Sequence, residues 1–176
     1  MISKADEIFP IVDEEGNTIG KATRAMCHNG SKLLHPVVHL HILTADGKIL
    51  LQKRAMNKDI QPGKWDTAVG GHVDYGETPA QAVLRESAEE LGINARQARQ
   101  LCRYVFESAI ERELVTTFVL TVDEAAFAPR FAEDEIDEVR FWSREEIQEG
   151  IAKDLLTPNF VMEYTQILPR HLRKDD

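Results

Sequence analysis

Glu86, Glu89 and Glu90 occupy positions i, i+3 and i+4 of a segment with a helical pattern. At about 100° per residue these positions share one helix face, so the three carboxylates converge. Like charges at this spacing cost a helix a few tenths of a kcal/mol per pair, which a bound cation would offset. Mg²⁺ takes carboxylate oxygens together with substrate phosphates. The alternative is a solvated acidic helix face that binds no ligand.

Histidines and two further glutamates form a second group of candidate ligands. His28, His35 and His72 are scattered along the sequence, whereas Glu111 and Glu113 are two residues apart. On a strand, residues i and i+2 point to one face, so both carboxylates would lie together. A site of imidazoles and carboxylates suits Mg²⁺, Mn²⁺ or Zn²⁺. Taken one by one, these residues are equally compatible with ordinary surface positions.

The helix that would carry the three glutamates has clear ends in the sequence. Thr78 can cap it, Pro79 suits the first helical position, and Leu91-Gly92 supplies a stop. Its apolar residues recur at helical spacing and predict one buried stripe, made of Ala80, Val83, Leu84, Ala88 and Leu91.

Around this helix the sequence predicts a mixed β-sheet covered by helices, an α/β (α+β) class. Residues 8–24 predict a hairpin, and the β-rich runs predict strands over residues 36–43, 49–54, 65–69, 115–122 and 139–142. Ser143 and Glu146 form a capping-box pattern for a helix that runs to about Lys153. A last helix is predicted from Asn159 to Leu168, ended by Pro169.

Length and composition predict one domain over residues 1–176, with a hairpin at about 8–24, a core at about 34–142 and C-terminal helices at about 143–172. A net charge of −9 argues against broad binding of nucleic acid or anionic membranes. The acidic N-terminal residues and the lack of a long apolar run predict a cytoplasmic protein with no membrane contact. Cys27 and Cys102 match no metal or redox motif and are interpreted as ordinary thiols.

A longer pattern surrounds the three glutamates. Gly71, Glu77 and the run from Arg85 to Ile93 (Arg-Glu-Ser-Ala-Glu-Glu-Leu-Gly-Ile) resemble the Nudix box over residues 71–93. Ser87 is a departure, since the family usually has an aliphatic residue or alanine there. The resemblance implies the Nudix fold, an α/β/α sandwich with a mixed sheet, and hydrolysis of a nucleoside diphosphate linked to another group or of a related diphosphate.

The same resemblance implies roles for individual residues. Glu86, Glu89 and Glu90 would hold Mg²⁺ or Mn²⁺, with Gly70 and Gly71 allowing close backbone approach because they lack a Cβ. Glu86 or Glu89 would act as the base, and the sequence does not choose between them. Arg85 and Glu77 would pair and orient the acids.

The second group of ligands is similar to one branch of the superfamily, the type I isopentenyl-diphosphate isomerases. In these enzymes two histidines seven residues apart, a histidine after a tryptophan-bearing strand and a Glu-x-Glu pair ligate one metal. His28, His35, His72, Glu111 and Glu113 match this pattern. The likeness also places Arg24, Arg54 and Lys58 where that family holds the diphosphate of its substrate.

Three departures favour hydrolysis over isomerisation. Gly70 stands where the isomerases have an essential cysteine, and residues 157–160 contain no tryptophan near the C-terminus. The isomerases also lack the first glutamate of the helix set and the first of its Glu pair, whereas Glu86, Glu89 and Glu90 are all present. The expected function is Mg²⁺-dependent cleavage of a small-molecule diphosphate. Isomerase activity and a non-catalytic diphosphate sensor are the alternatives, and a homodimer is left open.

Three aromatic side chains have two interpretations each. His39 and His41 alternate with apolar residues on the predicted strand 36–43, so they line a pocket or are hydrogen-bonded strand residues without a ligand. Trp65 stacks on a substrate or is buried in the core.

Overall fold

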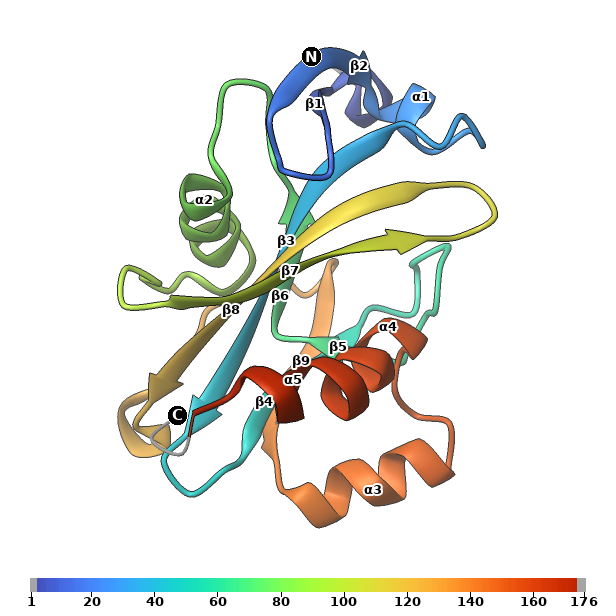
Figure 1. Ribbon diagram of the computed structural model, residues 1–176. Helices are drawn as coiled ribbons and strands as arrows, with labels where there is room; N and C mark the ends of the chain where they lie inside the picture. The colour runs from blue at the N-terminus through green and yellow to red at the C-terminus, as the bar shows by residue number, and fades with distance from the viewer. Residues whose placement is uncertain (1–2, 174–176) are drawn as a thin grey trace.

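Strand β3 (Leu34–Thr44) is the centre of the fold in this computed structural model, which describes residues 3–173 (Figure 1). Along one side it pairs in parallel with β8 (Arg112–Val122) over its whole length. Along the other side it pairs antiparallel with β6 (Val69–His72) and, at Leu43 alone, with β4 (Ile49–Arg54). The predicted mixed sheet is therefore confirmed.

Three further strands complete this seven-stranded sheet of the described residues. Strands β5 (Trp65–Thr67) and β9 (Ile136–Trp142) both pair antiparallel with β4. Strand β7 (Arg99–Glu107) pairs with β8 at the edge of the sheet. Strand β7 was not predicted, and the predicted starts of β8 and β9 lie three residues too late.

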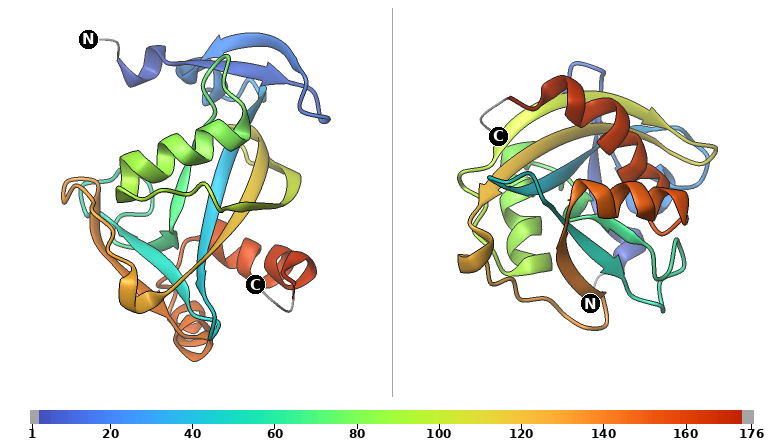
Figure 2. Two further views of the ribbon diagram at one scale, coloured as in Figure 1. Left: turned by 90° about the vertical axis from the view of Figure 1, so that its left-hand side faces the viewer. Right: turned by 90° about the horizontal axis from the view of Figure 1, so that it is seen from below.

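The two faces of β3 are covered by different helices, which gives the predicted α/β/α sandwich (Figure 2). Val38, Leu40 and Ile42 pack on the side of helix α2 (Pro79–Leu91), with Ala82 and Val83 of that helix in the same apolar cluster. On the other face Leu43 belongs to a second cluster that includes Phe160 and Leu168 from the C-terminal helices. The period of two along a strand separates the two clusters.

Helix α2 begins and ends where the sequence predicts. The Thr78 hydroxyl accepts from the Gln81 amide, the Gln81 side chain accepts from the Thr78 amide, and Gly92 closes the helix with a φ of 62°. The predicted buried stripe is wrong at Ala80 and Ala88, which are exposed. The buried side chains of the helix are Ala82, Val83, Ser87 and Leu91.

An N-terminal hairpin of β1 (Ile8–Val12) and β2 (Thr18–Thr23) confirms the prediction over residues 8–24. A 3₁₀ turn η1 (Lys4–Asp6) precedes it, and a short helix α1 (Arg24–Cys27) follows. Phe9 of the hairpin is buried, and its ring stacks on the His72 ring with centroids 4.4 Å apart. The hairpin thereby covers the end of the sheet where the candidate histidines lie.

The C-terminal part forms a chain of helices. Helix α3 (Arg144–Ala152) has the predicted capping box of Ser143 and Glu146. Beyond it lie α4 (Pro158–Met162), a π-helical segment η3 (Glu163–Ile167) and α5 (Leu168–His171). The prediction that Pro169 ends the helix is wrong, because Pro169 lies in the first turn of α5. In that turn the lack of an N–H removes no intrahelical hydrogen bond.

The loops add one further short element, the 3₁₀ turn η2 (Glu124–Ala126) after β8. None of the helices within residues 3–173 combines the length and the apolar character that a membrane crossing would require.

Candidate active site

One cleft of about 530 Å³ is lined by the three glutamates of the first group and by His72, Glu111 and Glu113 of the second, whereas His28 and His35 do not line it. It opens between α2, the end of β6 and the paired strands β3 and β8. Acidic side chains dominate its lining, and three of the predicted substrate-binding cations lie around them. The predicted residues that line it are Arg24, Arg54, Lys58, Gly70, Gly71, His72, Glu86, Glu89, Glu90, Glu111 and Glu113.

The acidic cluster consists of Glu86, Glu89 and Glu90 on α2. Glu86 packs against the strand so closely that a Cβ at Gly71 would lie 2.2 Å from its Cδ atom. Glu90 accepts from Gln52 Nε2 at 3.1 Å, and Gln52 also donates to the Ala68 carbonyl. Gly71 therefore makes room for a carboxylate, which is a more specific role than the general close approach predicted from the sequence.

Burial and repulsion from neighbouring carboxylates disfavour the ionised forms of Glu86 and Glu90. Burial, reinforced by the charge of Glu86, raises the pKa of Glu90 to about 8. Burial also raises the pKa of Glu86, against the lowering effect of Arg85. The Glu89 side chain, by contrast, is 60% exposed. A divalent cation among the three would remove the repulsion.

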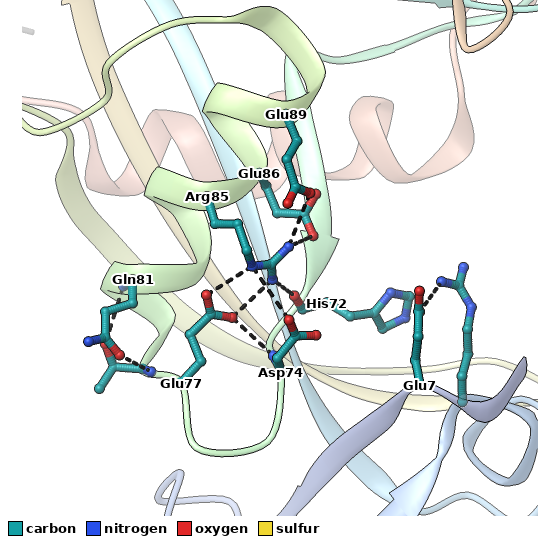
Figure 3. A network of polar contacts seen from close by, with 10 residues as sticks. Glu7, His72, Asp74, Glu77, Gln81, Arg85, Glu86 and Glu89 are labelled. Carbon is teal, nitrogen blue, oxygen red and sulfur yellow. Dashed lines mark hydrogen bonds and ion pairs between the residues drawn. The ribbon is translucent and has the colours of Figure 1, made fainter. Parts of the chain in front are cut away.

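Arg85 holds this cluster in place (Figure 3). Its Nε and NH2 atoms donate to the two oxygens of Glu77, both at 2.9 Å, which is the predicted pair in bidentate form. NH1 donates to Glu86 at 2.9 Å and to Glu89 at 3.3 Å, while NH2 also donates to the His72 carbonyl. One guanidinium thus links the loop before α2, strand β6 and the acidic face.

The histidine cluster consists of His28, His35, His72, Glu111 and Glu113. Ligand atoms of the three histidines and Glu113 all lie within 4.8 Å of one another. Glu111 joins them through an oxygen 3.1 Å from His28 Nε2. In the register of β3 and β8, His35 lies directly opposite Glu113. Five residues that are scattered in sequence therefore meet at one point.

The protonation of this cluster suits metal ligands. Burial lowers the pKa of His28 and His35, and it lowers that of His72 well below its ordinary value, so the imidazoles are neutral at pH 7. The His35 Nδ1 atom lies 2.9 Å from the Leu33 carbonyl, while its buried Nε2 atom has no hydrogen-bond partner within the described residues. Burial next to Glu111 raises the pKa of Glu113 to about 7.

Each predicted substrate-binding cation already contacts a carboxylate at the rim of the cleft. Arg24 donates to Glu7 at 3.0 Å, and Arg54 lies 3.6 Å from Asp66. Lys58 pairs with Glu135. These contacts are partly exposed and would exchange for phosphate oxygens at little cost.

A third cluster lies beside the cleft and was not predicted as a unit. Both oxygens of the fully buried Glu163 are engaged: Oε1 by His39 Nδ1 at 2.7 Å and by the Tyr104 hydroxyl at 2.5 Å, Oε2 by His41 Nε2 at 2.6 Å. Burial lowers the pKa of His39, but the neighbouring Glu163 raises it to about 9. No spacing rule could have joined residues so far apart in sequence.

Other aromatic and sulfur side chains lie away from the chemistry. Trp65 is 8% exposed and packs edge-on against Trp142, with ring centroids 5.0 Å apart, which favours the core interpretation. Cys27 is buried under the hairpin, and Cys102 contacts Thr117. Within residues 3–173, no cysteine lines the cleft.

Comparisons with known proteins agree with this geometry. The NUDIX domain model matches residues 33–160. An uncharacterized Nudix hydrolase of Yersinia pestis is 33% identical over 96% of this chain and 90% of its own length. An isopentenyl-diphosphate Delta-isomerase of Streptomyces griseus is 32% identical over 83% of this chain and 76% of its own. The crystal structure of DR0079 from Deinococcus radiodurans shares the fold, with a TM-score of 0.75, 22% identity and coverage of 95% and 100%. The chain belongs to the Nudix hydrolase family.

Proposed function

We propose that the protein hydrolyses a diphosphate bond in a nucleotide or another diphosphate-containing small molecule, with the help of a divalent metal. The observation that carries the proposal is that three carboxylates of one helix converge on a cleft that is also lined by the three predicted cations, Arg24, Arg54 and Lys58. Carboxylates suit the metal, and cations suit the phosphates.

The acidic cluster fits a hard divalent cation, because its buried carboxylates are crowded and their pKa values are raised. Glu86, Glu89 and Glu90, with the backbone of Gly70, would hold Mg²⁺ or Mn²⁺. Such an ion, when bound, neutralises phosphate charge and lowers the pKa of the attacking water.

Glu89 is the residue we assign as the base. Glu86 packs against Gly71 and Glu90 is bonded to Gln52, whereas the Glu89 carboxylate is largely exposed. Glu89 can therefore take a proton from a water in the cleft, and Arg85 keeps its carboxylate directed there. Arg24, Arg54 and Lys58 would bind the phosphate oxygens by exchanging their present carboxylate partners.

The histidine cluster fits a second ion. Burial lowers the pKa of its imidazoles, and the buried His35 Nε2 atom makes no hydrogen bond within the described residues. His28, His35, His72, Glu111 and Glu113 would hold Mg²⁺, Mn²⁺ or Zn²⁺, in a structural role or in orienting the substrate.

The test is a panel of diphosphates that includes dinucleotides, nucleotide sugars and prenyl diphosphates, each incubated with Mg²⁺ or Mn²⁺ and followed by product chromatography. We expect at least one compound to be cleaved at its diphosphate, and EDTA to stop the reaction. Binding of panel members without any turnover would contradict hydrolysis and favour a sensor.

Isomerase activity is the second candidate, because the Streptomyces griseus relative is named as such. Carbon protonation by a thiol has no support in this cleft, where Gly70 occupies the position that the likeness assigns to the cysteine. Proton NMR of isopentenyl diphosphate with the protein distinguishes the two. The appearance of the dimethylallyl isomer would overturn the hydrolase assignment.

A further inference from the structure

His39, on β3, lies in the wall of the cleft and has no role in the mechanism above. Its side chain is 16% exposed, and its Nδ1 atom contacts Glu163. The opposite edge of the ring lies beside Gly70, where a Cβ would be 3.4 Å from Cδ2 and 3.9 Å from Nε2. Because Gly70 lacks that Cβ and itself lines the cleft, the Nε2 edge stays open to a ligand.

Glu163 holds this imidazole in place. It is a fully buried carboxylate, and such a group persists only when it is paired and hydrogen-bonded. Donors from two strands satisfy it: His39 and His41 of β3, and Tyr104 of β7. Glu163 opens the π-helical segment, and such irregular turns occur frequently at functional sites.

His39 and His41 contact Glu163 through different ring nitrogens. His41 uses Nε2, and its buried Nδ1 atom has no hydrogen-bond partner within the described residues. His39 uses Nδ1, so Nε2 is the ring nitrogen that it presents to the cleft. In the imidazolium form, which a carboxylate beside Nδ1 favours, such a ring donates from both nitrogens.

We propose that His39 donates a hydrogen bond from Nε2 to an oxygen of the bound diphosphate, and that Glu163, braced by His41 and Tyr104, is its positioning residue. The proposal rests on the proposed function for the presence of a diphosphate in this cleft. It adds a donor from the wall of the cleft to the cations at the rim. Unlike those cations, His39 keeps its carboxylate partner when it binds, since the two contacts use opposite ring nitrogens.

Two substitutions at position 39 separate the two nitrogens. In His39→Asn the amide nitrogen replaces Nδ1, so Glu163 keeps its donor while the cleft loses Nε2. In His39→Gln the longer amide reaches towards the Nε2 position. With the best substrate of the panel, we expect His39→Asn to lower kcat/KM about tenfold or more at an unchanged melting temperature, and His39→Gln to recover part of the loss. Wild-type kcat/KM in a folded His39→Asn protein would overturn the proposal.

Coupling tests the positioning role of Glu163. Glu163→Gln keeps the shape but loses the charge, and we expect kcat/KM to fall about as far as in His39→Asn. The double variant should be no worse than either single one, because both remove the same contact. If Glu163 has only a structural role, the loss of kcat/KM should follow the loss of melting temperature across the variants, with Tyr104→Phe included. The losses of the two single variants should then multiply in the double variant. If Glu163→Gln does not fold, His39→Asn decides alone.

A binding measurement is independent of turnover. Uniformly ¹⁵N-labelled protein is titrated with methylenediphosphonate in the presence of Mg²⁺, and His39→Asn assigns the ring signals of His39. We expect the Nε2 resonance of His39 to move on binding. The proposal is wrong if the amide signals of α2 shift while the His39 signal does not. It is also wrong if a saturating concentration of the probe shifts neither set of signals. Turnover that fails while the His39 shift is present counts against the hydrolase and not against this contact.

Discussion

The acidic cluster and the histidine cluster share one cleft but are built in opposite ways. The first takes its three carboxylates from five consecutive residues of α2, of which Arg85 holds Glu86 and Glu89. The second takes its ligands from the end of α1, from β3, β6 and the start of β8. Local geometry preorganises the first cluster, whereas the second exists only when the whole sheet is assembled. Substitutions in the acidic cluster should therefore change the rate of hydrolysis, and substitutions in the histidine cluster should change the stability of the fold.

The largest effect is expected on the chemical side of this comparison. Glu89→Gln removes the assigned base from an exposed position, so hydrolysis should fall about 10²- to 10⁴-fold while the melting temperature is unchanged. Steady-state kinetics and thermal unfolding measure both. Glu149→Gln, an equally exposed glutamate on α3, is the matched control and should keep full activity. Full activity in Glu89→Gln and Glu90→Gln together would refute the catalytic assignment of α2.

A bound metal ion should stabilise the fold mainly through the histidine cluster. At about 100 times Kd, an ion that binds only the folded state adds about 2.7 kcal/mol to the free energy of unfolding. His35→Asn keeps a donor for the Leu33 carbonyl but lacks Nε2, so its gain with Zn²⁺ or Mn²⁺ should disappear. Urea unfolding with and without metal measures this. Glu89→Gln is the control, and an equal loss of metal stabilisation there would erase the distinction between the clusters.

Adjacent glycines between the clusters offer a sharper contrast. Gly71→Ala places a Cβ on the Glu86 carboxylate and should cost about 1–3 kcal/mol in the metal-free protein or displace that side chain. Gly70→Ala meets only ordinary contacts with His39 and should cost less than about 1 kcal/mol. Denaturant titration compares the two. Equal costs would show that Glu86 is not held against the strand.

A smaller effect is expected from the residue that braces the acidic cluster. Arg85→Lys keeps the charge but loses the planar fork that reaches Glu77, Glu86 and Glu89 at once. Activity should fall about tenfold through misplaced carboxylates, with KM little changed. Kinetics on the same substrate measure this. A variant as active as the wild type would mean that α2 alone fixes the geometry of the cluster.

The same contrast explains what the sequence could predict. Helix α2, its caps and its acidic face depend on neighbours three or four residues away, and these predictions are confirmed. The five residues of the histidine cluster were predicted through family resemblance, and their close approach now stands as geometry. Their role as ligands stays a proposal.

Other features had no local signal. Strand β7 lies at the edge of the sheet, partly exposed on both faces, so its residues do not alternate between apolar and polar. Pro169 was predicted to end the helix. The π-helical segment just before α5, which allows a new helix to begin there, cannot be recognised from the residue types. The partners of Glu163 lie on β3 and β7, so only tertiary packing brings them together.

The long parallel pairing of β3 with β8 has a consequence for how the chain reaches its native state. That pairing closes a large loop that contains α2, and the entropic cost of the loop arises before the contacts form, so we expect folding to be slow for the size of the chain. During synthesis, the edge of β3 that pairs with β8 is expected to stay unpaired until β8 has left the ribosome. Since His35 and Glu113 face each other across this pair, we expect the histidine cluster to bind an ion only after β3 and β8 have paired.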